Sequence, residues 1–342
     1  MVLPPTFVAG FHDEAAVRQM KYNRFGATGL LVSHLSIGTG GFCQQYGDYS
    51  INQCKEALHK AIKSGVNFID TAPWYGHGVS EEVLGKCLEG IPRQAYYVAT
   101  KVGRYQPDPK LMFDFSAGKT RESIELSLKK LGVEYIDLLQ AHDIEFDKSL
   151  STVLQETLPV LDEARRTGKA KFIGVTGYPV FTLAECIEKS RVKIDTILSY
   201  CRLSLIDTTL LQYLPDFKAR DLGVINAAGL CMGLLTDEGP QPWHPAPQFI
   251  KDICVEANEY CKANNVSLAR LATHYCYQQS GPDTTLVGMN NVDLVCANLD
   301  VLYNGIDSHE QQVLTDVLMR FFSKLKIGNW EQENNKFKET LP

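Results

Sequence analysis

Apolar runs of strand length alternate along this chain with amphipathic segments of helix length. Each apolar run is bounded by glycine or polar residues, as buried strands are. The eight strand-like runs are 34–38, 66–70, 96–100, 135–140, 171–175, 194–200, 223–227 and 284–288. Helical patterns between them include 53–65, 120–132, 153–168 and 252–265, several of which end in Gly or Asn after a basic last turn.

A strand followed by a helix, repeated eight times, predicts an α/β fold in which a closed parallel sheet is ringed by helices, the (β/α)8 TIM barrel. A doubly wound open sheet is the alternative. However, the glycines at 38, 40 and 41 do not form the GxGxxG pattern of dinucleotide-binding open sheets. No acidic residue downstream stands convincingly where a ribose ligand is expected. The barrel is therefore favoured.

The segments outside the eight units predict additions to one barrel domain that spans 1–342. Gly26 and Gly29 separate alternating apolar residues in 21–34, which predicts an N-terminal β-hairpin. Residues 1–19 are expected to be an extension, the core runs from about 21 to 300, and 301–342 form a C-terminal helix or tail near the barrel mouth. No stretch has the composition of a linker.

Composition favours small-molecule chemistry in the cytosol. The 342 residues are 44% hydrophobic, enough for a substantial core, and the net charge of −6 comes without a run of Lys or Arg, so we expect no nucleic-acid partner. The longest mostly apolar stretch, 223–235, is too short to span a bilayer, and the first residues do not form a basic and then apolar leader. We therefore expect no membrane partner either.

The cysteines and histidines give no sign of a disulfide framework or a metal site. The ten cysteines contain no CxxC pair, and the eight histidines show neither HxH nor HExxH spacing. Scattered cysteines in a chain of this size predict reduced thiols, as in the cytosol.

Four titratable residues stand at the ends of three successive predicted strands. Asp70 and Tyr75 follow the second strand, Lys101 ends the third and His142 ends the fourth. In a parallel barrel these ends meet at one mouth. A buried Lys needs a partner, which Asp70 supplies, and a Tyr beside the ammonium is expected to have a pKa below its usual value of about 10. Each residue alone has a structural explanation; together they predict proton chemistry, with His142 donating to a substrate oxygen.

These residues lie in segments that resemble the aldo-keto reductase superfamily: FIDTAPWYG (68–76), VATKVG (98–103), DLLQAHD (137–143) and GKAKFIGVTGY (168–178). The resemblance implies that Tyr75 is the general acid/base, that Lys101 lowers its pKa, that Asp70 pairs with the lysine and that His142 orients the carbonyl or hydroxyl. It also implies hydride transfer to or from a nicotinamide cofactor bound across the mouth, without a metal.

Further segments, 198–205, 229–247 and 286–291, are similar to the sugar-oxidising, L-galactose dehydrogenase-like branch of this superfamily. That similarity implies an aldose oxidised to its lactone, or a small aldehyde or ketone, as the substrate. It places Thr176 and Gly177 at the nicotinamide carboxamide, Tyr200 beneath the ring, and 228–234 along the pyrophosphate. The residues expected at the cofactor are Gly38, Thr39, Gly40, Asp70, Thr176, Gly177, Tyr200, Ala228, Leu230, Met232, Gly233, Leu234, Gly288, Met289, Asn290 and Asn298.

Departures from the family pattern favour NAD over NADP. Ile197 and Ala227 stand where many members have a Gln and a ring-stacking Tyr, so stacking on the nicotinamide must be supplied differently. Gly288 and Leu294 align with the Lys and Arg of NADP-preferring members. A desolvated 2′-phosphate needs such cations, and their loss favours NAD.

Substrate residues are less evident in the sequence. Trp74 and Trp243 offer aromatic faces that could pack on a sugar ring, and Arg104 or Arg202 could bind hydroxyls or a carboxylate. Packing within a lid explains the aromatic residues equally well.

Two other functions are compatible with the sequence: a cofactor-binding regulatory subunit with little turnover, and a metal-dependent hydrolase. A monomer is expected.

Overall fold

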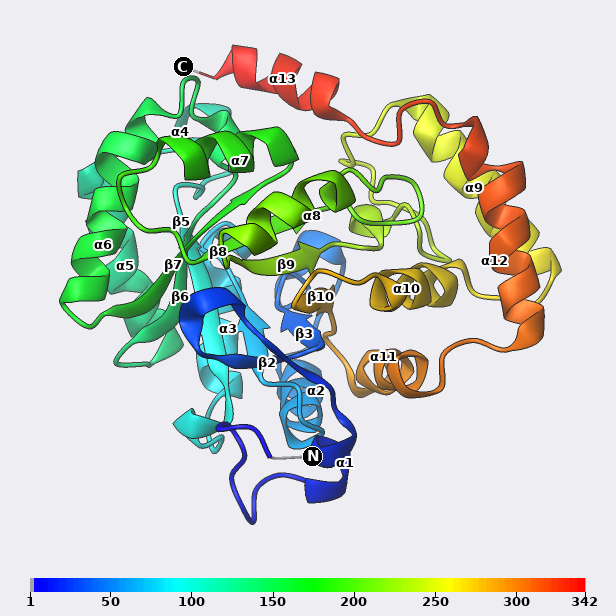
Figure 1. The fold of residues 1–342 in the computed structure, drawn as a ribbon, viewed down its shortest axis with the longest axis horizontal. Helices are drawn as coiled ribbons and strands as arrows, with labels where there is room; N and C mark the ends of the chain where they lie inside the picture. Colours follow the sequence, from blue (N-terminus) through cyan, green and yellow to red (C-terminus); the bar gives the residue numbers. More distant parts are fainter. Residues whose placement is uncertain (1–2, 342) are drawn as a thin grey trace.

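The computed structural model of the protein describes residues 3–341. Eight parallel strands close into a barrel in the order β10-β3-β4-β5-β6-β7-β8-β9, with helices around it (Figure 1). The strands are β3 (Leu35–Gly38), β4 (Phe68–Asp70), β5 (Tyr97–Val102), β6 (Ile136–Ala141), β7 (Ala170–Gly177), β8 (Thr196–Tyr200), β9 (Gly223–Ala227) and β10 (Thr284–Gly288). Each overlaps one predicted run, so the predicted barrel is confirmed.

The outer helices follow the strands and bury one apolar face each. In α2 (Ile51–Lys63) the buried positions are 54, 57, 58, 61 and 62, the spacing that places side chains on one side of a helix. The other helices of the ring are α3 (Val79–Cys87), α5 (Ala117–Leu131), α6 (Leu158–Arg166), α7 (Val180–Lys189), α8 (Leu210–Ala219), α10 (Leu268–Gln278) and α11 (Val292–Asn304). Helix α9 (Gln248–Ala263) lies farther from the barrel, against α10 (Figure 1). A short helix, α4 (Pro109–Met112), lies in the loop after β5.

A hairpin closes the lower end of the barrel, as the sequence predicted. Strands β1 (Tyr22–Arg24) and β2 (Leu31–Ser33) pair antiparallel. Phe25 between them is fully buried, and its ring meets that of Phe68 edge-on at 5.6 Å. At Gly26, where φ is +51°, a Cβ would lie 2.3 Å from the backbone nitrogen of Gly223. Only glycine permits this approach of the hairpin to the sheet.

The two terminal segments pack on the barrel. In the N-terminal extension, which contains α1 (Glu14–Gln19), Thr6 accepts a hydrogen bond from Asn67 at 3.0 Å. At the other end, α12 (Ser308–Arg320) lies beside α9, and α13 (Glu331–Thr340) follows it (Figure 1). The backbone nitrogen of Trp330 donates to the hydroxyl of Tyr178 at 3.0 Å, so the tail reaches the residue that follows β7. The expected tail at the barrel mouth is present.

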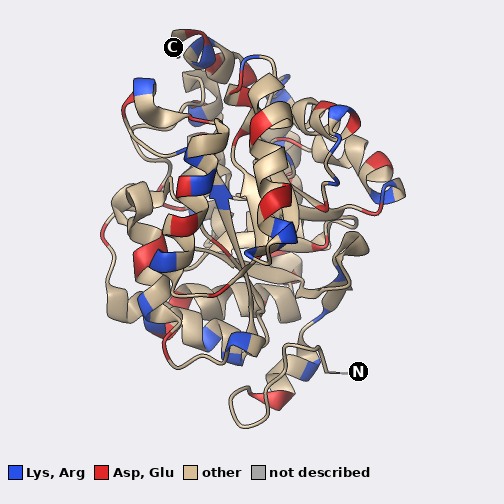
Figure 2. Ribbon diagram, turned by 90° about the vertical axis from the view of Figure 1, so that its left-hand side faces the viewer, with Lys and Arg blue, Asp and Glu red and all other residues tan. Residues whose placement is uncertain are grey.

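Surface charge and helix length add two findings. On the face drawn in Figure 2, acidic and basic residues are interspersed over the helices. Between residues 3 and 341, no helix has the length and apolar character needed to cross a bilayer. All ten cysteines are free thiols, and nine of them are buried.

Candidate active site

The strand register brings the predicted catalytic residues to one level of the barrel. Gly38 pairs with Asp70, and Lys101 pairs with Gln140 on the next strand. Lys101 is the penultimate residue of β5 and not its last, because the strand continues to Val102. His142 comes directly after β6. The upper ends of three neighbouring strands therefore present these side chains to one mouth.

The Lys101 ammonium is the centre of the site. It donates to Oδ1 of Asp70, to the backbone carbonyl of Thr71 at 2.8 Å, and to the hydroxyl of Tyr75 at 3.2 Å. Gln140 donates from Nε2 to the other oxygen of Asp70 at 2.9 Å. Lys101 and Asp70 are each 1% exposed at the side chain, so the ion pair has no water to replace either partner.

Burial dominates the electrostatics of this group. Burial raises the pKa of Asp70, against the opposing effect of the Lys101 ammonium. Burial also acts to lower the pKa of Lys101, but Asp70 and Tyr75 together raise it above its ordinary value, so the lysine stays cationic. The Asp70 carboxylate thus keeps the Lys101 ammonium, which the Tyr75 hydroxyl contacts, in its charged form.

The pKa of Tyr75 differs in direction from the sequence prediction. Burial raises it above the ordinary value of 10.0, and the nearby Lys101 ammonium only partly opposes that rise. The prediction was wrong because it counted the cation and not the desolvation of the phenolate. In the structure as it stands, Tyr75 is a phenol at neutral pH, able to give a proton.

His142 is neutral at physiological pH. Burial lowers its pKa from 6.5 to about 3, against the opposing effect of Asp143. Its ring meets that of Tyr75 edge-on, with centroids 6.1 Å apart. Nδ1 is buried and has no hydrogen-bond partner among the described residues. A neutral imidazole carries one N–H donor, which suits a role toward an uncharged carbonyl or hydroxyl.

The loop after β4 fixes Tyr75 in place. Tyr75 begins a 3-10 turn (Tyr75–Gly78) in which His77 has a positive φ of 55°. Its Nδ1 lies 2.8 Å from the carbonyl oxygen of Tyr105, in the loop after β5. At Gly76, with φ +60°, a Cβ would lie 2.6 Å from that of Cys43. The turn therefore needs glycine where it crosses the loop after β3.

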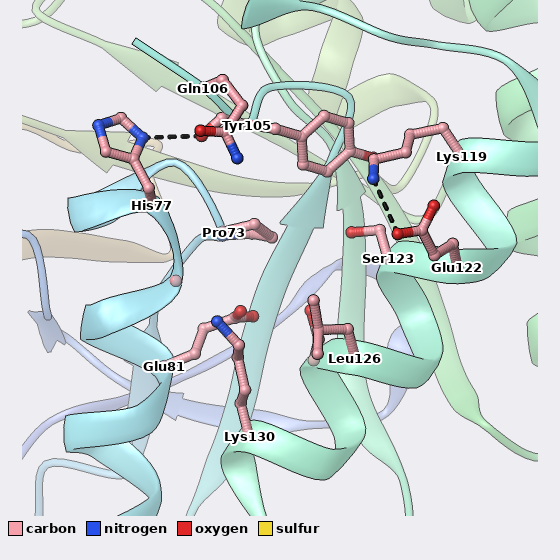
Figure 3. A pocket seen from close by; sticks show the side chains of 12 residues that line it. Pro73, His77, Glu81, Tyr105, Gln106, Lys119, Glu122, Ser123, Leu126 and Lys130 are labelled. Carbon is pink, nitrogen blue, oxygen red and sulfur yellow. Dashed lines mark hydrogen bonds and ion pairs between the residues drawn. The ribbon is translucent and has the colours of Figure 1, made fainter. Parts of the chain in front are cut away.

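A small cavity of about 80 Å³ lies outside the barrel wall, between α3 and α5 (Figure 3). Glu81 and Lys130 both point toward it in Figure 3. Glu81 is 1% exposed and accepts a 2.6 Å hydrogen bond from Thr100, the residue before Lys101. Burial raises the pKa of Glu81. This carboxyl group therefore supports β5 from behind rather than facing the mouth.

The segment after β9 has the form of an anion-binding loop. Ala228, Cys231, Met232 and Gly233 all have positive φ, between 50° and 103°. Across the part of the chain that the structure describes, the backbone N–H groups of Gly229, Leu230 and Met232 have no acceptor. Successive left-handed residues turn such groups toward one side, where they can bind phosphate oxygens. The loop has groups that could bind the pyrophosphate of a nicotinamide cofactor, and the contacts expected of Ala228, Leu230, Met232, Gly233 and Leu234 stay predictions.

The other residues expected at the cofactor divide into two groups. Tyr200 ends β8, half-buried, with its ring 5.2 Å from that of Tyr178, and it is available to lie beneath a planar group. Gly38 and Gly288 are paired neighbours, and Asn290 donates to the carbonyl of Gly41 at 3.3 Å, beside Gly40. These stay predicted contacts.

Several expected cofactor side chains already have protein partners. Thr39 bonds to Ser80 at 2.8 Å, and Thr176 accepts from the backbone of Asp143 at 3.0 Å. Asn298 accepts from Tyr277 at 2.9 Å and donates to the carbonyl of Leu294 at 2.8 Å. Met289 is fully buried in the core, and Gly177 faces a carboxyl group. For these residues the structure offers backbone or packing contacts.

The predicted substrate residues lie at different distances from the catalytic group. The guanidinium of Arg104 lies 3.9 Å from the ring centroid of Trp74, the neighbour of Tyr75. Trp243 is 46% exposed and contacts Tyr46 edge-on at 5.5 Å. Trp74 and Arg104 thus adjoin the site, whereas Trp243 joins the loops after β9 and β3 at the rim.

Three residues of the mouth were missed by the sequence analysis. Gln140 supports Asp70, Asp143 pairs with Arg104 at 2.6 Å, and Glu145 accepts from the backbone of Tyr178 at 3.0 Å. Burial raises the pKa of Glu145 to about 8, and Asp143 adds to the effect. A polar Gln inside an apolar strand, and two acids directly after His142, were the available signals.

The described residues, 3–341, hold no metal-binding cluster of the usual kind. Within that range no cluster of three or more His, Cys, Asp or Glu side chains could hold a metal ion.

The chain is similar to known proteins in sequence and in fold. The model of the Aldo/keto reductase family matches residues 34–318. The chain is 38% identical over 284 residues to L-galactose dehydrogenase of Arabidopsis thaliana, covering 82% of this chain and 88% of that protein. It is 33% identical over 292 residues to D-arabinose 1-dehydrogenase of Saccharomyces cerevisiae, covering 82% and 83%. A holo-form aldo-keto reductase structure from Bacillus halodurans superposes with a TM-score of 0.67 at 24% identity, over 87% of this chain and 96% of that one.

Proposed function

This chain belongs to the aldo/keto reductase family, and from that premise we propose that it is an aldose dehydrogenase that uses a nicotinamide cofactor, preferably NAD. The observation that carries the proposal is the buried chain of contacts from Asp70 through Lys101 to Tyr75, with the ring of His142 beside the phenol. Such a chain couples a fixed positive charge to one exchangeable proton.

Each side chain has a separate task in the oxidation of an aldose to its lactone. His142 donates a hydrogen bond to the anomeric oxygen and fixes its position. For oxidation, the Tyr75 hydroxyl first releases its own proton to solvent at the mouth, and the phenolate, stabilised by the Lys101 ammonium, then takes the proton from that oxygen as the hydride leaves the anomeric carbon. In carbonyl reduction, Tyr75 gives the proton back. A bound nicotinamide cofactor supplies or accepts the hydride.

The charges around the adenosine end support NAD. The sequence contains no Lys or Arg from residue 271 to 319, a stretch that includes β10 and α11. The first turn of α11 carries Asp293, an exposed acid. A 2′-phosphate there would meet a negative charge and no cation from β10 or α11, whereas an unsubstituted ribose hydroxyl can donate to a carboxylate.

The names of the relatives support a sugar substrate. L-Galactose and D-arabinose, the sugars in the two relatives' names, have the same configuration at carbons two to four. We infer that an aldose with this configuration is the substrate class to test first. A small aldehyde or ketone is the other substrate class, since a relative at 26% identity is an NADH-specific methylglyoxal reductase of Escherichia coli.

The test is a substrate panel followed by cofactor absorbance in both directions. We expect NAD-dependent oxidation of L-galactose and D-arabinose, with slower turnover of the epimers at carbon two. Preferential reduction of simple aldehydes would replace the sugar assignment. Tight cofactor binding without turnover of any aldose or aldehyde would instead favour a regulatory subunit that senses the cofactor.

A further inference from the structure

Beside the catalytic group lies a second ion pair, between Arg104 and Asp143. Nη1 of Arg104 is 2.6 Å from Oδ2 of Asp143, and the two side chains are 20% and 3% exposed. The other oxygen of Asp143 lies 3.6 Å from Nε2 of His142. This ion pair therefore lies close enough to contact a substrate whose carbonyl or hydroxyl His142 orients.

The pair has hydrogen-bonding capacity that the protein leaves unused. Oδ1 of Asp143 accepts no hydrogen bond from any described residue. Nε of Arg104 is buried and likewise has no acceptor in the described chain, and Nη2 has only the sulfur of Met112 at 3.8 Å. Buried polar atoms of this kind are normally satisfied, which points to a ligand that completes them.

Local structure holds Asp143 in this position. Its φ is +51°, in the left-handed region that Asp tolerates better than most residues. Its backbone N–H donates to Thr176 at 3.0 Å. Two aromatic contacts hold Arg104, since its guanidinium lies over the rings of Trp74 at 3.9 Å and Phe113 at 5.2 Å. Both partners are preorganised before any substrate arrives.

We propose that the Arg104–Asp143 pair binds hydroxyl groups of a polyhydroxylated substrate next to the reacting carbon, and so selects sugars over simple aldehydes. The inference rests on the proposed function and adds the group that would determine its specificity. A hydroxyl both donates and accepts, so one can donate to Asp143 and a neighbouring one can accept from Arg104.

The charge balance argues for hydroxyls over a carboxylate. The Asp143 carboxylate already neutralises Arg104, so a second anion would find no uncompensated positive charge to bind it. An apolar aldehyde would leave the same buried donors and acceptors without partners, which costs binding free energy. Sugar hydroxyls satisfy both groups, while Trp74 offers a ring face nearby.

The experiment combines two variants with mono-deoxy analogues of the best aldose, each lacking one ring hydroxyl. We expect Asp143→Asn to lower kcat/KM for the parent aldose about 10- to 100-fold, as the loss of a charged hydrogen bond does. For the analogue that lacks the contacted hydroxyl, the same variant should lower kcat/KM by less than about threefold, because there is no bond left to lose. Arg104→Gln should show the same non-additivity with a neighbouring hydroxyl.

The matched control is Asp137→Asn, at the lower end of the same strand. Asp137 is equally buried and pairs with Arg93 at 2.5 Å. Its variant should lower thermal stability without changing the ratio of kcat/KM between the parent and deoxy sugars. Equal effects of Asp143→Asn on parent and all deoxy sugars would overturn this inference while leaving the aldose dehydrogenase intact. Wild-type protein that turns over aldehydes and no aldose would overturn both.

Discussion

Nζ of Lys101 lies 3.2 Å from Oη of Tyr75, and the lysine is buried while the tyrosine is partly exposed. Because burial alone would make the phenolate very costly, the lysine is the group that keeps deprotonation within reach. The contact thus lowers the free energy of the Tyr75 phenolate relative to that of the phenol.

Removal of the Tyr75 hydroxyl tests the proton transfer. We expect Tyr75→Phe to lower kcat about 10²- to 10⁴-fold, the usual contribution of a positioned acid or base, with the cofactor Kd nearly unchanged. Kinetics and a cofactor fluorescence titration measure the two effects. Tyr303→Phe is the control, since the Tyr303 hydroxyl has no partner among the described residues. Wild-type turnover in Tyr75→Phe would exclude the mechanism.

The Asp70–Lys101 pair should behave as one unit in stability measurements. Asp70→Asn and Lys101→Met each leave a buried charge unpaired, which we expect to lower the free energy of unfolding by about 3–5 kcal/mol. The double variant should lose clearly less than the sum, because no unpaired charge remains. Urea denaturation of all four proteins gives the coupling, and simple additivity would show that the two charges act independently.

Glu145 should make the fold less stable as the pH rises. Its pKa is raised by burial from 4.5 to about 8, so between these pH values the unfolded chain has lost a proton that the folded chain keeps. The contribution of Glu145 to stability is therefore greatest below pH 4.5 and falls by up to about 1.4 kcal/mol per pH unit toward pH 8. Glu145→Gln should flatten this fall, and Glu256→Gln, on the exposed face of α9, should not. Parallel curves for Glu145→Gln and the wild type would contradict the assignment.

The preference between NAD and NADP should follow from the lack of Lys and Arg in β10 and α11. We expect a higher kcat/KM with NAD than with NADP, and Leu294→Arg should raise the NADP value about 5- to 10-fold by supplying one charge-assisted contact. Leu294 is 41% exposed in the first turns of α11, so the substitution disturbs no core packing. Met319→Arg, at an exposed position of α12, controls for added charge. A tenfold preference of the wild type for NADP would refute the argument.

The sequence predicted the barrel because the eight apolar runs must be buried and each is followed by an amphipathic helix. It also predicted that Asp70, Tyr75, Lys101 and His142 come together, since polar residues at strand ends meet at the mouth. Asp143 and Glu145 escaped notice because their importance depends on neighbours distant in the chain, Arg104 and Tyr178. The rise in the Tyr75 pKa escaped for a similar reason: contact with a cation can be inferred from a motif, but the extent of burial requires coordinates.

The hairpin beneath the barrel restricts how substrate and product reach and leave the site. Phe25 fills the lower end, and apolar side chains such as Phe68 and Leu138 pack above it, so the upper mouth is the end at which the site can be reached. Substrate and product must enter and leave through the same mouth, so a product that dissociates slowly delays binding of the next substrate. We therefore expect product release to be partly rate-limiting, so that kcat should fall as the viscosity of the solvent is raised.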